Sequence, residues 1–280
     1  MIQHHVNNRQ LLDRLRAEEF PIPLAFADET ERTDSIPLLR LLEGDTLREQ
    51  IEKVARKKDS DNLTAAASLF QKRYAGTLLA AVLTPMSTFG VGFLAHFDET
   101  EVVLEDGLPV EIVLRGNRPP LVFPTRLPPS MQRMAQENEW TAVEQVRDLR
   151  WPVLQAAFNN NLGPLIYKLA SEFKLAPRVM WGNIGNYVGY LYDLLRSKEA
   201  FYAQAAQDRD SLLHSVGFDG PPLGKTFTEV WLPELDPPQW VRVRSSCCMW
   251  YKFPGNKPCY TCPLLCNEER AEVLSSHKAK

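Results

Sequence analysis

The stretch "TLLAAVLTPMSTFGVGFL", residues 77–94, is the most apolar window of the chain and decides its fold class. Its length approaches that of a membrane-spanning helix. Pro85 and Gly90 interrupt it, however, and Thr84 and Ser87 add polar groups. These interruptions favour a buried helix that runs into a buried strand. The window therefore predicts the core of a globular protein that mixes helices with strands.

Helical and strand patterns alternate along the rest of the chain. Residues 1–74 are predicted to be helical, with one helix starting at Asp45 or Thr46. Residues 91–116 are β-rich runs separated by turn signals, which predicts a small antiparallel meander. Apolar residues return to helical spacing from Pro128 to about Val216. The fold class is therefore α+β, a mostly helical body with a small antiparallel sheet.

The chain changes character after Gly217, where proline and glycine become dense. Regular helix is not expected there until the tail that begins at Asn267. We therefore predict three regions: an N-terminal helical region at 1–74, an α+β body at 75–217, and a compact C-terminal module at 218–280.

The composition excludes several classes of function. The formal net charge of −3 argues against nucleic acid as a partner. The first 20 residues are charged and amphipathic, unlike a secretory signal, so we expect a protein of the reducing cytoplasm. A flavin or nicotinamide enzyme would carry a glycine-rich fingerprint between a strand and a helix. The runs "FGVG" at 89–92 and "GNIG" at 182–185 are too short for that and indicate close packing instead.

All five cysteines of the chain fall between residues 247 and 266. A chain of 280 residues can bury a core without disulfides, and an odd number of cysteines in one segment is no disulfide framework. The spacing C-C-x10-C-x2-C, from Cys247 to Cys262, brings four soft sulfur donors together on one loop. The cluster therefore predicts a metal site.

The chemistry of the residues leaves zinc and iron–sulfur both open. Adjacent cysteines such as Cys247 and Cys248 converge on one tetrahedral zinc only if the backbone between them is bent. A [2Fe–2S] cluster divides four thiolates between two irons and accepts such a pair more readily. Pro263 after Cys262 is also typical of some ferredoxin motifs. Iron–sulfur is thus favoured, with a zinc-stabilised, non-enzymatic interaction module as the alternative.

This cysteine motif resembles the C-terminal [2Fe–2S] motif of the ferric siderophore reductases of the FhuF type. The segment "LAPRVMWGN" at 175–183 is similar to a helix-capping segment of the same family. The resemblance implies that a [2Fe–2S] cluster is bound by four cysteines and that Cys266 is not a ligand. The four implied ligands are Cys247, Cys248, Cys259 and Cys262.

The resemblance further implies an iron–sulfur oxidoreductase that acts in iron acquisition. It would transfer one electron to siderophore-bound Fe(III), which releases Fe(II) in the cytoplasm because the hard oxygen donors of a siderophore suit ferric iron better. Region 75–217 would face the siderophore, expected to be of the hydroxamate type, and region 218–280 would hold the cluster. No general acid, base or nucleophile is needed, so no catalytic side chain is predicted beyond the cysteines.

The expected partners follow from the same reasoning. Since no nucleotide-binding fingerprint is present, electrons would come from a separate donor such as a ferredoxin, a flavodoxin or an NAD(P)H-dependent reductase. Peripheral contact with the inner membrane or with a siderophore importer is a further expectation. The four basic residues between 241 and 267 would stabilise the anionic cluster or form a docking face with Trp250; they are Arg242, Arg244, Lys252 and Lys257.

Other residues offer weaker signals. The segment around His96 resembles siderophore synthetases that work without a peptide-assembly template, in which Gln-Asn closely follows the histidine. Phe97 and Asp98 break that pattern, so a synthetase-like protein is only the second alternative. Trp181 and Asn183 are expected to pack in the core and cap a helix, or else to line a siderophore cleft. Among nearby tyrosines, a buried helix face is expected to be shared by Tyr187 and Tyr190.

Overall fold

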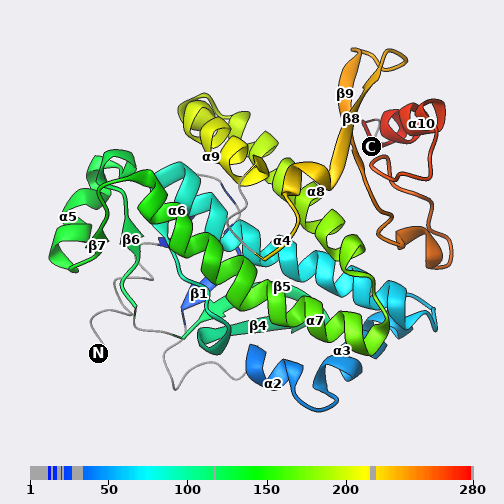
Figure 1. Cartoon of the computed structure of the whole chain (residues 1–280), viewed down its shortest axis with the longest axis horizontal. Helices are drawn as coiled ribbons and strands as arrows, with labels where there is room; N and C mark the ends of the chain where they lie inside the picture. Colours follow the sequence, from blue (N-terminus) through cyan, green and yellow to red (C-terminus); the bar gives the residue numbers. More distant parts are fainter. Residues whose placement is uncertain are drawn as a thin grey trace.

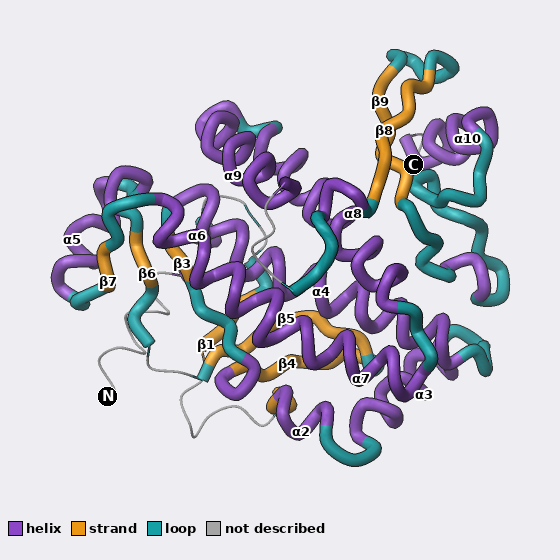
Figure 2. Tube along the Cα trace, viewed as in Figure 1, coloured by secondary structure: helices purple, strands orange, loops and turns teal. Residues whose placement is uncertain are grey.

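The computed structural model describes residues 34–115, 118–214 and 219–278, together with positions 12, 13, 15–17, 20 and 22–26. Helices dominate this part of the chain and strands form small sheets (Figure 2). Helix α4 (Leu63–Phe89) runs through the middle of the molecule (Figure 1). The C-terminal segment, orange to red in Figure 1, stands at one end and contacts α8 (Pro177–Arg196). The predicted α+β class is confirmed.

Helix α4 is the central core element, and local chemistry fixes both of its ends. Asn62 caps its start, because the side-chain Oδ1 accepts a hydrogen bond from the backbone N–H of Ala65 at 2.9 Å. The helix ends at Gly90 in the left-handed conformation, where a Cβ would lie 2.7 Å from Cβ of Arg126. Strand β3 (Val91–Gly92) follows at once. The predicted passage from a buried helix into a buried strand is confirmed.

Among the helices of the described residues, α3, α6, α7, α8 and α9 contact α4. A π-helical segment (Gln155–Leu162) joins α6 to α7 without a break. The helical spacing predicted for residues 128–216 is confirmed except at Thr141–Ala142, which form a short strand, and residues 215–216 lie outside the described residues. The remaining α-helices of the described residues are α2 (Leu38–Leu42), α3 (Thr46–Lys57), α5 (Pro129–Glu137), α6 (Val146–Leu154), α7 (Gly163–Phe173), α9 (Tyr202–His214) and α10 (Asn267–Lys278).

The main sheet has four strands in the order β1-β5-β4-β2 and packs against α4. Its centre is the antiparallel hairpin β4 (Thr100–Glu105) and β5 (Leu108–Leu114), which turns at the predicted Asp106-Gly107. Strand β1 (Leu24–Phe26) adds to β5 in parallel, and β2 (Ser35–Pro37) adds to β4 antiparallel. The sheet is therefore mixed rather than purely antiparallel.

The predicted meander is also wrong at its first strand. Strand β3 pairs with β6 (Leu121–Val122), and β7 (Thr141–Ala142) adds to β6 in parallel. Strand β3, which follows the turn at Gly90, thus belongs to a second sheet rather than to the sheet of the β4–β5 hairpin.

The prediction that residues 1–74 are helical is wrong at β1 and β2. Pro23 directly precedes β1 and Pro37 ends β2, and residues near proline avoid helical backbone geometry. Helix α3 does begin at Thr46 after Asp45, as predicted. The predicted boundary after residue 74 falls inside α4, so a single helix passes through both predicted regions.

The C-terminal module contains a β-hairpin, the cysteine-bearing loop and the tail helix α10. The hairpin of β8 (Phe227–Leu232) and β9 (Gln239–Arg244) was not predicted, because the surrounding prolines and glycines masked two short alternating runs. The helix expected from Asn267 is confirmed. A small hydrophobic cluster separate from the main core includes Leu232, Val241 and Ala271, which ties the hairpin to α10.

Three glycines of α8 form the surface against which this module packs. A Cβ on any of them would collide with a side chain of the module, since it would lie 2.5 Å or less from the nearest atom in every case. The packing interpretation of "GNIG" is therefore confirmed at both of its glycines. The facing pairs are Gly182 with Ser246, Gly185 with Thr226, and Gly189 with Arg242.

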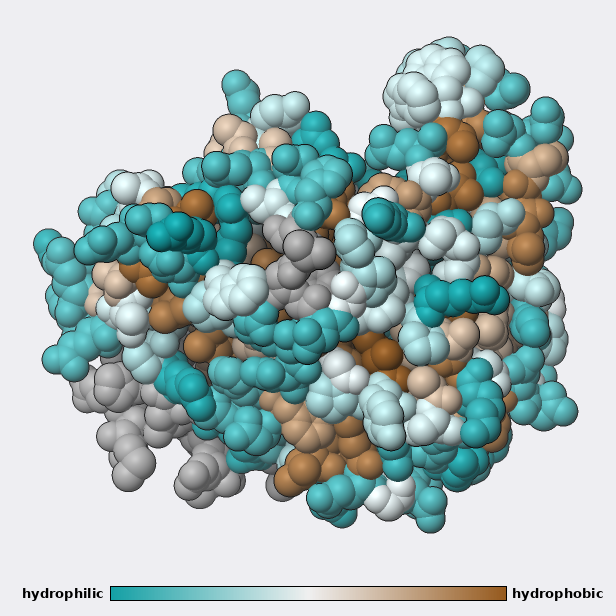
Figure 3. All heavy atoms as spheres, viewed as in Figure 1, coloured by the Kyte–Doolittle hydropathy of each residue, from teal (hydrophilic) through white to brown (hydrophobic). Residues whose placement is uncertain are grey.

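The surface offers no continuous apolar band in the view of Figure 3, where brown patches lie separately among polar residues. Within the described residues, no helix combines the length and the apolar composition needed to cross a bilayer. The apolar stretch that includes α4 is accordingly a core element, as its interruptions predict.

Candidate metal centre

Four of the five cysteines form two pairs in the loop that follows β9. The Sγ atoms of Cys247 and Cys262 lie 3.7 Å apart. Cys248 and Cys259 make up the second pair, since the interaction between their thiols is the largest influence on the pKa of each. Adjacent residues Cys247 and Cys248 thus take different partners, as expected where neighbouring side chains point to opposite sides of the backbone.

This pairing discriminates between the two metal sites that the sequence left open. A structural zinc site requires four ligands that converge on one ion. Within the described residues, no group of three or more His, Cys, Asp or Glu side chains is gathered closely enough to hold one metal ion. A [2Fe–2S] cluster needs two thiolates on each of two irons, which two separate pairs can supply. The arrangement therefore suits a two-iron cluster better than a single zinc.

The backbone of the loop turns sharply next to the cysteines and directs N–H groups at sulfur. Met249 adopts a left-handed conformation with φ 65°, and its N–H lies 3.3 Å from Sγ of Cys247. The backbone N–H of Trp250 also helps to lower the pKa of the Cys248 thiol. A tight turn in the C-x2-C segment is closed by the hydrogen bond from Cys262 N to Cys259 O at 2.8 Å. Such N–H donors stabilise thiolates and raise the potential of a bound cluster.

Arg244 is the one cation of the predicted basic group that lies inside the site. Its side chain is only 1% exposed, and its Nη2 donates to Sγ of Cys259 at 2.7 Å. Burial alone would lower the pKa of this guanidinium, but the neighbouring Cys248 and Cys259 outweigh it and raise the pKa. Arg244 is therefore placed to stabilise negative charge on sulfur, and it is excluded from the predicted docking face by its burial.

A buried polar network fixes Arg244 to the helical body. Asn183 Oδ1 accepts from Arg244 Nη1 at 3.2 Å, and its Nδ2 donates to Gln71 Oε1 at 3.0 Å. Ser68 of α4 donates to the backbone carbonyl of Cys248 at 2.9 Å. Asn183 thus lies inside α8 rather than at its end, and it neither caps a helix nor lines a cleft. It joins the body to the cysteine loop.

The thiol pKa values reflect this unequal environment. The hydrogen bond from Cys259 is the largest influence on Cys248 and, with the charge of Arg244, lowers its pKa to about 4. The same hydrogen bond raises the pKa of Cys259. Burial raises the pKa of Cys247 to about 11. One proton shared within the Cys248–Cys259 pair accounts for the opposite directions of their pKa shifts.

The fifth cysteine lies apart from these pairs. Cys266 is exposed, and its backbone N–H donates to Glu269 at 3.0 Å. The loop between the pairs and α10 is held instead by Arg270, which donates to the carbonyls of Cys262 and Leu265, each at 2.9 Å, and to that of Tyr260. This role was not predicted, because a lone arginine in an exposed-looking tail helix carries no pattern.

The structure also shows where the aromatic residues and the histidine that the sequence singled out lie. Trp181 is buried and stacks on Phe158, with centroids 6.5 Å apart, so it packs in the core. His96 contacts Asn160 and is not among the residues that line the cavities described below. The predicted buried face of Tyr187 and Tyr190 is wrong for Tyr190, which is 54% exposed.

The remaining basic residues differ in environment. Arg242 forms an ion pair with Asp193 and lies over the ring of Phe227, so its charge is already compensated. Lys252 and Lys257 are exposed.

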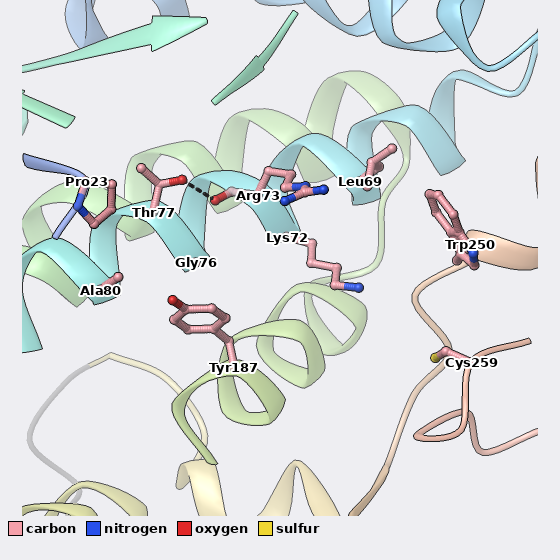
Figure 4. A pocket seen from close by; sticks show the side chains of 10 residues that line it. All are labelled: Pro23, Leu69, Lys72, Arg73, Gly76, Thr77, Ala80, Tyr187, Trp250 and Cys259. Carbon is pink, nitrogen blue, oxygen red and sulfur yellow. Dashed lines mark hydrogen bonds between the residues drawn. The ribbon is translucent and has the colours of Figure 1, made fainter. Parts of the chain in front are cut away.

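Two cavities open beside the cysteine loop, and Trp250 and Cys259 line both of them. The first, of about 580 Å³, lies between α4, α8 and the loop. The second, of about 550 Å³, lies between the loop and α10 and includes Lys257 and Glu272. Figure 4 shows the first, with Cys259 at one end. The sequence did not reveal either cavity, because their walls come from distant segments.

Comparisons with known proteins give matches for both the helical body and the cysteine loop. Residues 68–219 match the family model described as "Ferric iron reductase FhuF-like transporter", and residues 244–264 match "FhuF 2Fe-2S C-terminal domain". The second match includes Arg244 and the four paired cysteines and ends before Cys266. No curated protein matches the chain.

Solved structures with a similar fold include aerobactin synthetase IucA from a hypervirulent pathotype of Klebsiella pneumoniae. One IucA structure has a TM-score of 0.61 at 13% identity, covering 82% of this chain and 45% of that one. Its ATP-bound form has a TM-score of 0.59 at 13% identity, covering 82% and 44%. The chain thus spans less than half the length of these synthetases, and at this identity the likeness is one of fold.

Proposed function

The chain belongs to the family of ferric iron reductase FhuF-like proteins and carries that family's [2Fe–2S] C-terminal domain, and on this basis we propose that it reduces siderophore-bound Fe(III) to Fe(II) by one electron. The observation that carries the proposal is the division of four cysteines into two pairs beside a cavity. The proposed ligands are Cys247, Cys248, Cys259 and Cys262.

The residues of the chain prepare the site for a one-electron carrier. A bound [2Fe–2S] cluster supplies a centre that accepts and passes on a single electron. Arg244 offsets the added negative charge, and Asn183 holds its guanidinium in place. Trp250 packs against the main core and lines the same cavity as Cys259. Proton transfer is not required for such a step, so the reaction needs no general acid or base.

The substrate and the electron donor are separate parts of the proposal. The substrate is a ferric siderophore, of the hydroxamate type in our proposal, whose oxygen donors bind Fe(II) less tightly than Fe(III). The donor is a second protein, such as a ferredoxin, a flavodoxin or an NAD(P)H-dependent reductase. Because Trp250 and Cys259 line two cavities, an electron can enter from one and leave through the other. We place this reaction in the cytoplasm, with peripheral contact at the inner membrane or a siderophore importer.

A synthetase reaction is the second candidate, since the fold is shared with aerobactin synthetase. The position next to His96 argues against it, because Phe97 and Asp98 replace the Gln-Asn expected in such an ATP site. His96 itself contacts Asn160 at 3.3 Å. ATP turnover that depends on a carboxylate and an amine would favour the synthetase.

Metal analysis tests the proposal first. Protein purified without oxygen is expected to contain two irons and two sulfides per chain and, once reduced, to give the EPR signal of a [2Fe–2S] centre. Stoichiometric zinc without sulfide would refute the reductase and favour the zinc-stabilised interaction module.

A further inference from the structure

We propose that the cavity between α4, α8 and Trp250 binds the ferric chelate, and that it selects chelates with net negative charge. This inference rests on the proposed reductase function and adds the place of binding and the charge class of the substrate. We call this the α4–α8 cavity; it is lined by Pro23, Leu69, Lys72, Arg73, Gly76, Thr77, Ala80, Tyr187, Trp250 and Cys259.

The size and position of the α4–α8 cavity suit a small metal chelate. Its volume of about 580 Å³ lies within the range of roughly 300–1,000 Å³ that is common for small-molecule sites. Cys259 forms part of its wall at one end (Figure 4), so a ligand that reaches this end would lie beside a proposed cluster ligand. An electron would then have to cross only the contact between the thiolate and the chelate. The cavity therefore meets the main geometric requirement of the reaction.

The charged residues of the cavity wall are both cations. Lys72 and Arg73 project from neighbouring positions of α4 (Figure 4), and no acidic residue is among the described residues that line the cavity. In the described part of the chain, neither side chain forms an ion pair or a side-chain hydrogen bond. Cations without a carboxylate partner in a concave site favour an anionic ligand.

The opposite wall supplies a neutral donor. Tyr187 of α8 packs against Gly76, where a Cβ would lie 3.1 Å from its ring, so glycine lets the ring approach α4. Burial raises the pKa of Tyr187 to about 12, which keeps its hydroxyl protonated near neutral pH. A protonated phenol donates to oxygen, and oxygen atoms form the surface of a hydroxamate or carboxylate chelate. Leu69 and Ala80 complete an apolar floor for the organic linkers of the ligand.

Lys72 could act on the cluster rather than on the ligand, and the experiment must distinguish these two roles. Its charge also acts on Cys248 and lowers the pKa of that thiol, so it could serve simply as a counter-charge of the cluster. In that role its loss would lower the cluster potential and leave ligand affinity unchanged. Arg73 is exposed and is not among the main influences on the pKa of Cys248 or Cys259, so its replacement reports chiefly on the ligand.

Binding is measured first, without electron transfer. Ferrioxamine B carries one net positive charge, its N-acetyl derivative none and its N-succinyl derivative one net negative charge, while the hydroxamate iron centre stays the same. Their Ga(III) forms cannot be reduced, so calorimetric titration of the cluster-loaded protein reports binding alone. We expect the succinyl form to bind about fivefold more tightly than the acetyl form, and the amine form to bind more weakly still.

Variants then locate the charge effect. Lys72→Gln and Arg73→Gln are each expected to weaken binding of the succinyl form about threefold to fivefold, and the double variant to abolish the preference among the three chelates. Arg147→Gln, which removes an exposed arginine outside the cavity, is the matched control and should change nothing. Equal affinity for all three chelates, or a preference that survives in the double variant, would overturn the inference.

The Fe(III) forms distinguish failure of this inference from failure of the proposed function. Each chemically reduced cluster should give one electron to one Fe(III), so that one cluster is oxidised for each Fe(II) formed. If all three chelates oxidise the cluster equally in wild type and in the double variant, the reductase stands and the cavity assignment is wrong. If the Ga(III) chelates bind with the expected preference but no Fe(III) chelate oxidises the cluster, the reductase function is refuted and the binding site stands.

Discussion

Replacing Arg244 with Gln should lower the reduction potential of the bound cluster. The guanidinium is buried and donates to Sγ of Cys259 at 2.7 Å. At a separation of about 6 Å between its centre and the middle of a cluster held by that sulfur, and an effective dielectric constant of about 20, one charge contributes about 3 kcal/mol. For a one-electron couple this corresponds to a fall of ~120 mV, because about 59 mV is a tenfold change.

The sign follows from the charge that reduction adds. A nearby cation stabilises the extra electron of the reduced cluster. Removal of the cation therefore destabilises the reduced form more than the oxidised form, which lowers the reduction potential. The hydrogen bond to Cys259 acts in the same direction, since it stabilises negative charge on sulfur. Arg244→Lys keeps the charge and loses the second donor to Asn183, so its potential should lie between those of the wild type and Arg244→Gln.

The assay is a potentiometric titration followed by visible absorbance, on protein whose iron and sulfide contents match the wild type. Lys257→Gln serves as the control, because this lysine is exposed. Even at the same separation, a charge in water contributes only about 0.7 kcal/mol, or ~30 mV. A fully loaded Arg244→Gln protein whose potential differs from the wild type by no more than this control would refute the reasoning.

Three further results are expected. Changing any of the four paired cysteines to Ser should remove or badly damage the cluster by iron, sulfide and absorbance analysis, whereas Cys266→Ser should keep it, and a colourless Cys266→Ser protein would contradict the ligand assignment. Gly185→Ala should destabilise the chain by about 1–3 kcal/mol in denaturant unfolding, because its Cβ would collide with Thr226. Gly163→Ala, with only an ordinary contact at 3.5 Å, is the control and should be neutral or stabilising, so equal losses in both would contradict the packing interpretation. Removal of the cluster by a chelator should leave far-UV circular dichroism nearly unchanged, because the main core contains none of the cysteines; a large loss of helix would show that the body depends on the metal.

Local patterns predicted the parts of this molecule that depend on neighbouring residues. The apolar stretch 77–94 indicated the central helix and its passage into a strand, because glycine at position 90 is needed for the left-handed turn. The spacing of the cysteines placed four of them on a single loop, and in the structure these four form the pairs Cys247 with Cys262 and Cys248 with Cys259. Turn signals likewise placed the hairpin at Asp106-Gly107.

Features that depend on distant packing could not be predicted in this way. Strands β1 and β2 are three residues each and gain their hydrogen bonds only from β5 and β4, so no local pattern marks them. Arg244 was grouped with exposed cations, because only its contact with Asn183, 61 residues away, reveals that it is buried. The α4–α8 cavity joins residues from distant segments and had no signal in the sequence.

A single-turnover measurement tests the proposed reduction of siderophore-bound iron most directly. The protein is reduced without oxygen, mixed with a ferric hydroxamate siderophore, and followed by cluster absorbance together with a colorimetric trap for Fe(II). We expect the spectrum of the oxidised cluster to return as one Fe(II) forms per cluster. A cluster that stays reduced in the presence of every ferric siderophore, with no Fe(II) formed, would contradict the proposed function.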